Sequence, residues 1–322
     1  MSETPLHPLV DPYAEKAHRK GCGCSGCARM REGLTVDDVR ALDVMPPLPH
    51  CRRCMSWRRL NALRGVCWHE GSMRTLVWFS AGAASAVAAK IALQNCAEVV
   101  IAYTDPGSEH PDNQRFIVDC EKWFGREVVR LKSKKYSDTW QVWRERRYLN
   151  GPAGALCTVE LKKRQRFDFQ QPDDVQVFGY TVEERDRADR FRQNNPEVTL
   201  WTPLIDEGLR KSDCLAIIDR AGIALPEMYL LGYRNNNCIG CVKGGRGYWN
   251  KVRRDFPETF QRMALLEREV GRSCINGQFL DELAIDSGNH QTEADMDCSL
   301  LCAATSDELM TAQAAEPAKE PT

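Results

Sequence analysis

Short apolar runs alternate with helical patterns through the middle of the chain. The run at residues 74–80 is apolar, β-branched and aromatic, which predicts a buried strand. Further strands are predicted at residues 98–104, 127–133, 175–181 and 199–204. Because helical patterns lie between them, we expect a three-layer α/β/α fold around a mainly parallel five-stranded sheet.

The two ends of the chain differ from this central part. Residues 1–72 are rich in Cys, Arg and Pro and lack a strand-like run, so they form a small Cys-rich extension before an α/β domain at 73–280. Residues 281–322 hold ten acidic residues against one lysine. This acidic tail carries Cys298 and Cys302, and its end is expected to be disordered.

Composition narrows the class of protein. Of 322 residues, 43% are hydrophobic and 28% are charged, which excludes a disordered or fibrous chain. No stretch of eighteen apolar residues is present, so no membrane span is expected. The first residues are partly acidic and carry no apolar run, so we expect no secretory signal and a cytoplasmic protein.

Charge is distributed unevenly along the chain. The formal net charge of −1 argues against a protein wholly dedicated to coating nucleic acid. Residues 122–166, however, hold thirteen Lys or Arg and four acidic residues. This basic belt suits an anionic substrate, and a solvated helix surface is the alternative.

The fifteen cysteines are an odd number, which in a reducing compartment favours metal ligands and a reactive thiol over disulfides. Cys24, Cys27, Cys51 and Cys54 form two CxxC knuckles, a pattern close to that of a structural zinc site. A different ligand set, or no metal, is the alternative. Arginines around the knuckles make nucleic acid a candidate partner.

A loop of small residues joins the first predicted strand to a helix. Ser80, Gly82 and Ser85 lie in this SAGAAS loop. Small residues allow close approach of the backbone to a ligand, and a helix N-terminus offers N–H groups to a phosphate. Tight packing between strand and helix is the other reading of the same residues.

Several blocks resemble the phosphoadenosine-phosphosulfate (PAPS) reductase family of the PP-loop, or adenine nucleotide alpha-hydrolase-like, superfamily. SAGAAS is similar to the family's SGGxDS loop, and residues 103–112, YTDPGSEHPD, are similar to its DTGxxxPET loop. Later blocks agree in order. They lie at residues 157–163, 179–188, 226–241 and 297–302. The resemblance implies the same α/β fold and an adenine nucleotide as ligand.

The resemblance also implies roles for single residues. Those expected to contact the nucleotide or its phosphates are Ser80, Gly82, Ser85, Asp105, Gly107, Lys162, Gly179 and Arg187. Mg²⁺ with the nucleotide and a thioredoxin-like electron donor are further expectations. The chain departs from the family at Ala81, which replaces a glycine, and at Ala84, which replaces an aspartate of many ATP-splitting members. The loss of that carboxylate removes a contact to Mg²⁺ or pyrophosphate.

The cysteines of the central domain and tail complete the prediction. By resemblance, Cys157, Cys238 and Cys241 are candidate ligands of a [4Fe–4S] cluster, with a redox CxxC or a zinc site as alternatives. Cys298 matches the family's catalytic cysteine, and Cys302 is placed to resolve an enzyme S-sulfonate.

Three functions follow from these patterns. The first is a PAPS-reductase-like enzyme for sulfur or thiol redox chemistry or sulfur transfer. The second is ATP-dependent sulfur insertion into tRNA or DNA, which the knuckles and basic belt favour. The third is a nucleotide- or nucleic-acid-binding module that has lost the chemistry.

Overall fold

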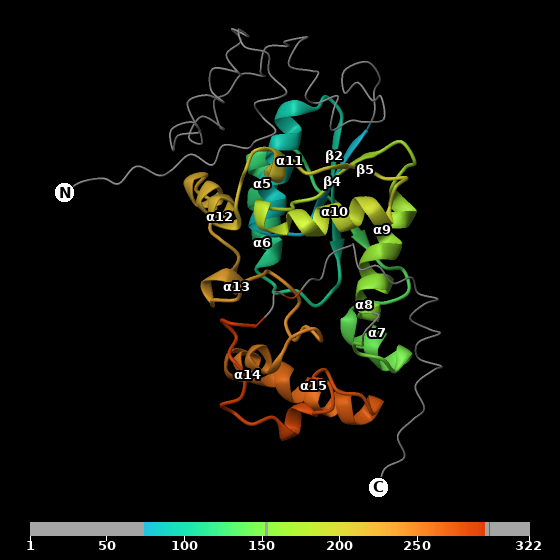
Figure 1. Ribbon diagram of the computed structural model, residues 1–322, viewed down its shortest axis with the longest axis vertical. Helices are drawn as coiled ribbons and strands as arrows, with labels where there is room; N and C mark the ends of the chain where they lie inside the picture. The colour runs from blue at the N-terminus through green and yellow to red at the C-terminus, as the bar shows by residue number, and fades with distance from the viewer. Residues whose placement is uncertain (1–73, 152–153, 294–295, 297–322) are drawn as a thin grey trace, which may run out of the picture. The chain divides into compact units, whose positions relative to one another are not determined.

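The computed structural model describes residues 74–151, 154–293 and 296 (Figure 1). The predictions for the Cys-rich extension, with Cys24, Cys27, Cys51 and Cys54, lie outside the described residues. Those for Cys298 and Cys302 do so too. The division into three segments stays a prediction.

Five parallel strands form the predicted sheet. They are β1 (Thr75–Phe79), β2 (Val99–Asp105), β3 (Val129–Lys132), β4 (Val175–Val177) and β5 (Thr199–Trp201). Their order is β3-β2-β1-β4-β5, and all four pairings are parallel. Each strand lies inside or across the run that predicted it, so the α/β fold class is confirmed.

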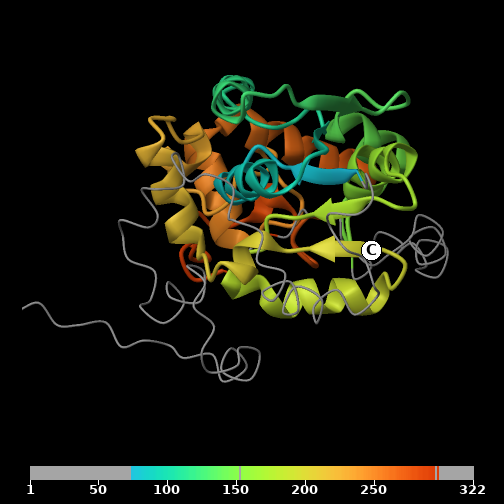
Figure 2. The ribbon, with the colours of Figure 1, turned by 90° about the horizontal axis from the view of Figure 1, so that it is seen from above.

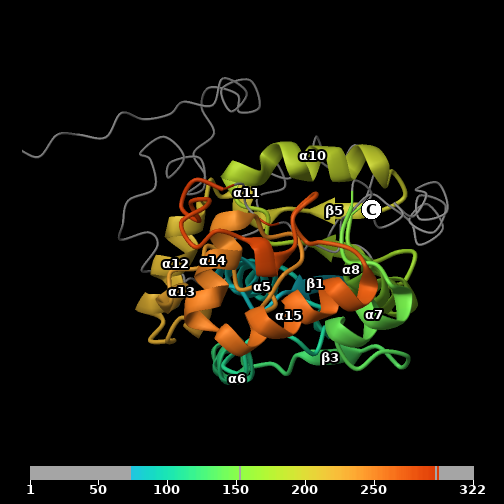
Figure 3. The same ribbon diagram turned by 90° about the horizontal axis from the view of Figure 1, so that it is seen from below.

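Helices cover both faces of the sheet. Phe79 of β1 packs against Phe116 and Phe124 of α6 (Asn113–Phe124) on one face. Its neighbour Trp78 points to the other face and packs against Phe169 of α9 (Arg164–Phe169). Figures 2 and 3 show α6 and α10 (Arg185–Asn194) on opposite sides of the strands. Apolar side chains on both faces of a strand require this covering, as the continuous apolar runs predicted.

The remaining elements connect and extend these layers. In chain order they are α5 (Ala83–Asn95), α7 (Thr139–Arg146), α8 (Leu156–Thr158), the π-helix η2 (Val159–Lys163), η3 (Val182–Glu184), α11 (Pro203–Asp206), α12 (Lys211–Arg220), α13 (Glu227–Leu230), α14 (Arg246–Asp255), α15 (Pro257–Val270) and η4 (Leu280–Glu282). Among the described residues, no helix is long and apolar enough to cross a membrane.

A second apolar core lies away from the sheet, where α14 and α15 pack with α7 and α8 (Figure 1). Trp143 and Trp249 are buried in it. The carboxylate of Glu267 on α15 is buried there as well and accepts the backbone N–H groups of Cys274 and Leu280. Burial raises the pKa of Glu267. The two hydrogen bonds that its carboxylate accepts anchor the chain after α15.

Candidate functional site

The loop between β1 and α5 is built by its own serines. The Ser80 N–H donates to Ser85 Oγ at 3.0 Å, and Ser85 Oγ donates to the carbonyl oxygen of Gly82 at 3.0 Å. The two hydroxyls also lie 3.0 Å apart. Ser80 is exposed and Ser85 is buried, so the hydrogen bonds of the Ser85 hydroxyl hold the turn from inside the protein.

Ala81 stands in this loop with a left-handed backbone, at φ 54°. Residues with a Cβ adopt this region at a cost of about 1–2 kcal/mol, whereas glycine does not. Ala81 therefore adopts a backbone conformation that favours glycine. Its carbonyl oxygen accepts a hydrogen bond from Asn236 Nδ2 at 2.7 Å.

Asn236 and Tyr229 complete the loop, and the sequence interpretation did not single out either residue. Asn236 is buried and also donates to Asn113 Oδ1 at 2.7 Å, while its own Oδ1 is buried without a hydrogen-bond partner among the described residues. Burial raises the pKa of Tyr229 to about 12, against the opposing effect of the backbone N–H groups of Ala83 and Asn236. The phenol oxygen thus lies at the first amide of α5. From the sequence, Asn236 and Tyr229 were included only as part of the block at residues 226–241 that resembles the PAPS reductase family.

The loop after β2 is fixed by Asp105 and Gly107. Asp105 accepts the N–H of Gly107 at 2.8 Å and forms an ion pair with Lys132 at 2.9 Å. Gly107 has φ 68°, and a Cβ at this position would lie 2.1 Å from the carbonyl oxygen of Ser137. Glycine is required there for both reasons. Ser108 continues the loop, and its carbonyl oxygen accepts the N–H of Ile239 at 3.0 Å.

Glu109 gathers three polar side chains around one carboxylate. It accepts hydrogen bonds from Tyr103 at 2.7 Å and Asn113 at 2.8 Å, and it pairs with Lys162 at 3.4 Å. Lys162 belongs to the π-helix η2, in which Glu160 and Lys163 are also buried. The ion pair with Glu109 thus connects Lys162 of η2 to the second loop. The sequence did not reveal Glu109 as its partner. Its contact with a phosphate stays a prediction.

Gly179 serves the site through packing. A Cβ on this residue would lie 2.7 Å from the Cα and N atoms of Ser85 and 2.9 Å from the carbonyl carbon of Ala84. Only a glycine allows the first turn of α5 to lie so close to the end of β4. Arg187 lies nearby in sequence, pairs with Glu184 and stacks 5.2 Å from the centre of the Tyr180 ring.

Cys157, Cys238 and Cys241 are all buried. The turn between the last two is held by Tyr248, whose hydroxyl accepts the N–H groups of Gly240 and Cys241 and donates to the carbonyl oxygen of Cys238. Cys274 is buried in the same apolar core as Cys157 and Cys241. Burial raises the pKa of Cys274, and Glu267, Cys241 and Cys157 raise it further.

No three His, Cys, Asp or Glu side chains in the described part of the chain are grouped so that they could hold a metal ion. The iron–sulfur cluster and the Mg²⁺ remain predictions.

The last described residues of the chain, Glu293 and Met296, also contact this region. Glu293 accepts the N–H groups of Gly247 at 2.6 Å and Tyr248 at 2.9 Å, at the start of α14. Asn237 Nδ2 donates to the carbonyl oxygen of Met296 at 3.1 Å. Met296 therefore lies beside the turn that carries Cys238 and Cys241.

Comparisons with known proteins give little beyond this. No family model matches the chain, and no curated protein matches it. A solved structure that matches is phosphoadenylyl-sulfate (PAPS) reductase from Candida auris in a phosphate complex, at 13% identity and a TM-score of 0.38. The match covers 64% of this chain and 96% of that chain. A likeness this distant carries no argument about function.

Proposed function

We propose that the chain is an enzyme that binds an adenine nucleotide between its two sheet loops and acts on sulfur with thiols, in the manner of PAPS reductases. The observation that carries the proposal is the meeting of three separate sequence blocks, at residues 80–85, 103–112 and 226–241. Asn236 bonds to the first loop through Ala81 and to the start of α6 through Asn113. Ile239 bonds to the second loop, and Asn237 bonds to Met296.

This arrangement suits a nucleotide for two physical reasons. The loop lies at the carboxyl end of the central strand, where open parallel sheets bind ligands, and it opens a helix whose N–H groups favour a phosphate. The buried Oδ1 of Asn236 also supplies an acceptor for a hydroxyl or amino group of a ligand, since a buried acceptor without a donor is costly.

The sulfur chemistry is assigned to the tail cysteines. The Cys298 thiolate attacks the sulfonyl sulfur of a sulfonucleotide, so that an S–S bond forms, the sulfur–oxygen bond to the nucleotide breaks and the nucleotide leaves with the electron pair. The Cys302 thiolate then attacks Cys298 Sγ, releasing sulfite and leaving a disulfide. A thioredoxin-like dithiol reduces that disulfide. The contact between Asn237 and Met296, two residues before Cys298, supports this assignment.

The buried thiols fit a further group. Cys157, Cys238 and Cys241 are soft ligands in aromatic, apolar surroundings, which is the donor chemistry of an iron–sulfur cluster. Each cysteine of such a cluster binds its own iron, so these ligands need not converge on one ion. When bound, the cluster would supply one-electron redox chemistry to the site.

The test uses the full chain purified without oxygen. Adenylyl sulfate, PAPS and ATP are titrated against it, and sulfite release is measured with a dithiol. We expect Ser85→Ala to weaken nucleotide binding. Ser287→Ala, whose hydroxyl donates to Ala284 and accepts from Asn250 Nδ2 at 3.5 Å, away from both loops, should leave it unchanged. Cys298→Ser should abolish sulfite release, with Cys96→Ser as the control.

The outcomes separate the three functions. Failure of all three nucleotides to bind would refute the proposal. Binding without sulfite release, together with pyrophosphate release from ATP when RNA or DNA is present, would indicate sulfur insertion into nucleic acid. Binding without either product would indicate a binding module. If the protein purified without oxygen contains no iron, the iron–sulfur cluster is refuted, and the rest of the proposal is unaffected.

A further inference from the structure

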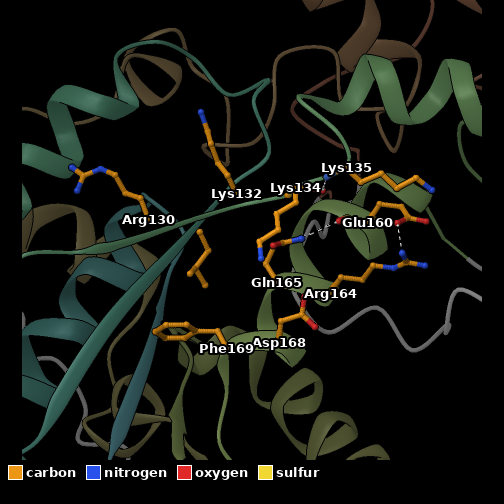
Figure 4. A pocket seen from close by; sticks show the side chains of 11 residues that line it. Arg130, Lys132, Lys134, Lys135, Glu160, Arg164, Gln165, Asp168 and Phe169 are labelled. Carbon is orange, nitrogen blue, oxygen red and sulfur yellow. Dashed lines mark hydrogen bonds and ion pairs between the residues drawn. The ribbon is translucent and has the colours of Figure 1, made fainter.

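A groove of about 450 Å³ lies along β3, apart from the two sheet loops (Figure 4). One wall is β3 with the turn that follows it, and the other is formed by Glu160 of η2 and by α9. Its charged lining consists of five basic and two acidic residues: Arg130, Lys132, Lys134, Lys135, Arg164, Glu160 and Asp168. The sequence placed these cations in a belt, and the fold arranges them around one hollow.

Neither Glu160 nor Asp168 forms an ion pair with a lysine of this groove in the described part of the chain. The Glu160 carboxylate is buried and is shared by Arg164 at 3.1 Å and Arg146 at 3.5 Å. Lys134 and Lys135 are both exposed and form no ion pair with a described residue, and Lys135 contacts only the ring of Tyr136. Two positive charges therefore remain available to an external anion.

The turn that carries these lysines has a fixed shape. Ser133 Oγ accepts the backbone N–H groups of Lys135 and Tyr136, both at 3.2 Å. Tyr136 is buried in the apolar core beside α7, which ties the turn to the protein. In Figure 4 the Lys134 side chain is directed into the groove.

Apolar surface in and beside the groove accompanies the charge. Leu131 and Phe169 line it, and the Phe169 ring is held in place by Trp78 and by the Arg74 guanidinium. Phe167 of α9 does not line the groove: it precedes Phe169 by two residues, about half a helical turn. It is 56% exposed and carries the guanidinium of Arg166 at 4.8 Å from its ring centre. Cations beside aromatic rings are what a strand with unpaired bases requires, because phosphates need the charge and bases stack on rings.

The length of the groove favours a chain over a compact anion. Four residues of β3 extend about 13 Å at the usual rise of a strand. The groove accompanies three of them and the turn beyond, so its cations are spread along a line. A single phosphate would engage one end only.

We propose that this groove binds single-stranded nucleic acid, with the backbone phosphates on Lys134 and Lys135 and a base against the aromatic surface of α9. None of the groove residues belongs to the loops of residues 80–85 or 105–113, although Lys132 forms an ion pair with Asp105 of the second loop. Lys134 and Lys135, which carry the proposal, form no such pair, so the inference does not rest on the adenine-nucleotide site. It specifies a surface in the described domain, distinct from the Cys- and Arg-rich extension.

The experiment measures binding of the full chain to fluorescent oligothymidylate and oligouridylate by anisotropy over a salt series. Each phosphate contact to a single strand contributes about 0.7 to the slope of log K against log salt. The double variant Lys134→Ala/Lys135→Ala should therefore lower that slope by about 1.4. Lys134→Arg/Lys135→Arg should restore it.

The matched control removes two exposed charges elsewhere. Lys122→Ala/Arg220→Ala, on α6 and α12, produces the same change in net charge and should leave the slope unchanged. Comparison of the two oligonucleotides decides between DNA and RNA as the source of the strand.

Three results would overturn the proposal. They are no binding by the wild-type chain at low salt, an equal loss in the groove and control variants, and displacement by polyglutamate as strong as by an oligonucleotide of equal charge. Adenine-nucleotide binding, measured on the same groove variants, should be unchanged. A failure of the groove proposal is thereby separated from a failure of the nucleotide site.

Discussion

Two glycines with nearly the same backbone allow the geometry of the second loop to be tested. Gly107 has φ 68° and Gly125 has φ 66°. A Cβ on Gly125 would meet nothing within 4 Å, whereas a Cβ on Gly107 would lie 2.1 Å from the carbonyl oxygen of Ser137. Alanine at the two positions therefore differs only in the space around the added methyl group.

The expected free energies follow from this difference. The left-handed backbone costs alanine about 1–2 kcal/mol at either position. Gly107→Ala must in addition displace backbone, which costs about 1–3 kcal/mol. The total loss of unfolding free energy is then about 2–5 kcal/mol for Gly107→Ala and about 1–2 kcal/mol for Gly125→Ala.

Thermal and urea unfolding of both variants measure these losses, and a domain of this size loses about 2–4 °C in Tm per kcal/mol. Nucleotide titrations of the same samples test function. Because Ser108 connects this loop to Ile239, Gly107→Ala should weaken nucleotide binding, whereas Gly125→Ala, at the end of α6, should not. Equal losses of stability in the two variants would refute the close approach to Ser137.

Three further predictions test the network around the loops. Ser85→Ala removes three hydrogen bonds of the first loop and should lower the unfolding free energy by about 1–3 kcal/mol in urea; an unchanged midpoint would contradict the network. Lys162→Met leaves the carboxylate of Glu109 buried without its cation and should lower the unfolding free energy by about 3–5 kcal/mol. Adding Glu109→Gln to this variant should restore most of that loss. If the effects of the two substitutions simply add in a double-mutant cycle, the ion pair does not contribute to stability. Hydrogen bonding to Arg115 lowers the pKa of Asp112 below its ordinary value of 3.8. The stability that this carboxylate contributes is therefore fully present above pH 3.8 and is lost as the pH falls through the lowered pKa. Asp112→Asn should make the fall of unfolding free energy below that pH shallower, and an equal slope in the two proteins would exclude this origin.

The sequence predicted the strands well because a buried strand is marked by a short run of apolar residues that are neighbours in the sequence. The runs at residues 74–80 and 98–104 are apolar on both faces, and both are strands covered on both sides. It did not give the order in which the strands pair. That order depends on how the connecting helices cross the sheet, so β1 and β4 lie side by side although about a hundred residues separate them.

The candidate site was predicted in part. Ser85 and Gly107 fix the two loops, and Gly179 admits the first turn of α5. Asn236 was missed because an asparagine has no distinctive spacing, and its importance comes from Ala81 and Asn113, each more than a hundred residues away.

Residue type and local pattern alone determined the five strands, the small-residue loop and the accumulation of basic residues before residue 166. Tertiary structure decided which partners these residues meet: Glu109 for Lys162, the amides of α14 for Glu293, and an open groove for Lys134. The physical reason is that burial and strand formation depend on neighbouring residues, whereas ion pairs, buried amides and grooves depend on atoms that only the folded chain brings within a few ångströms.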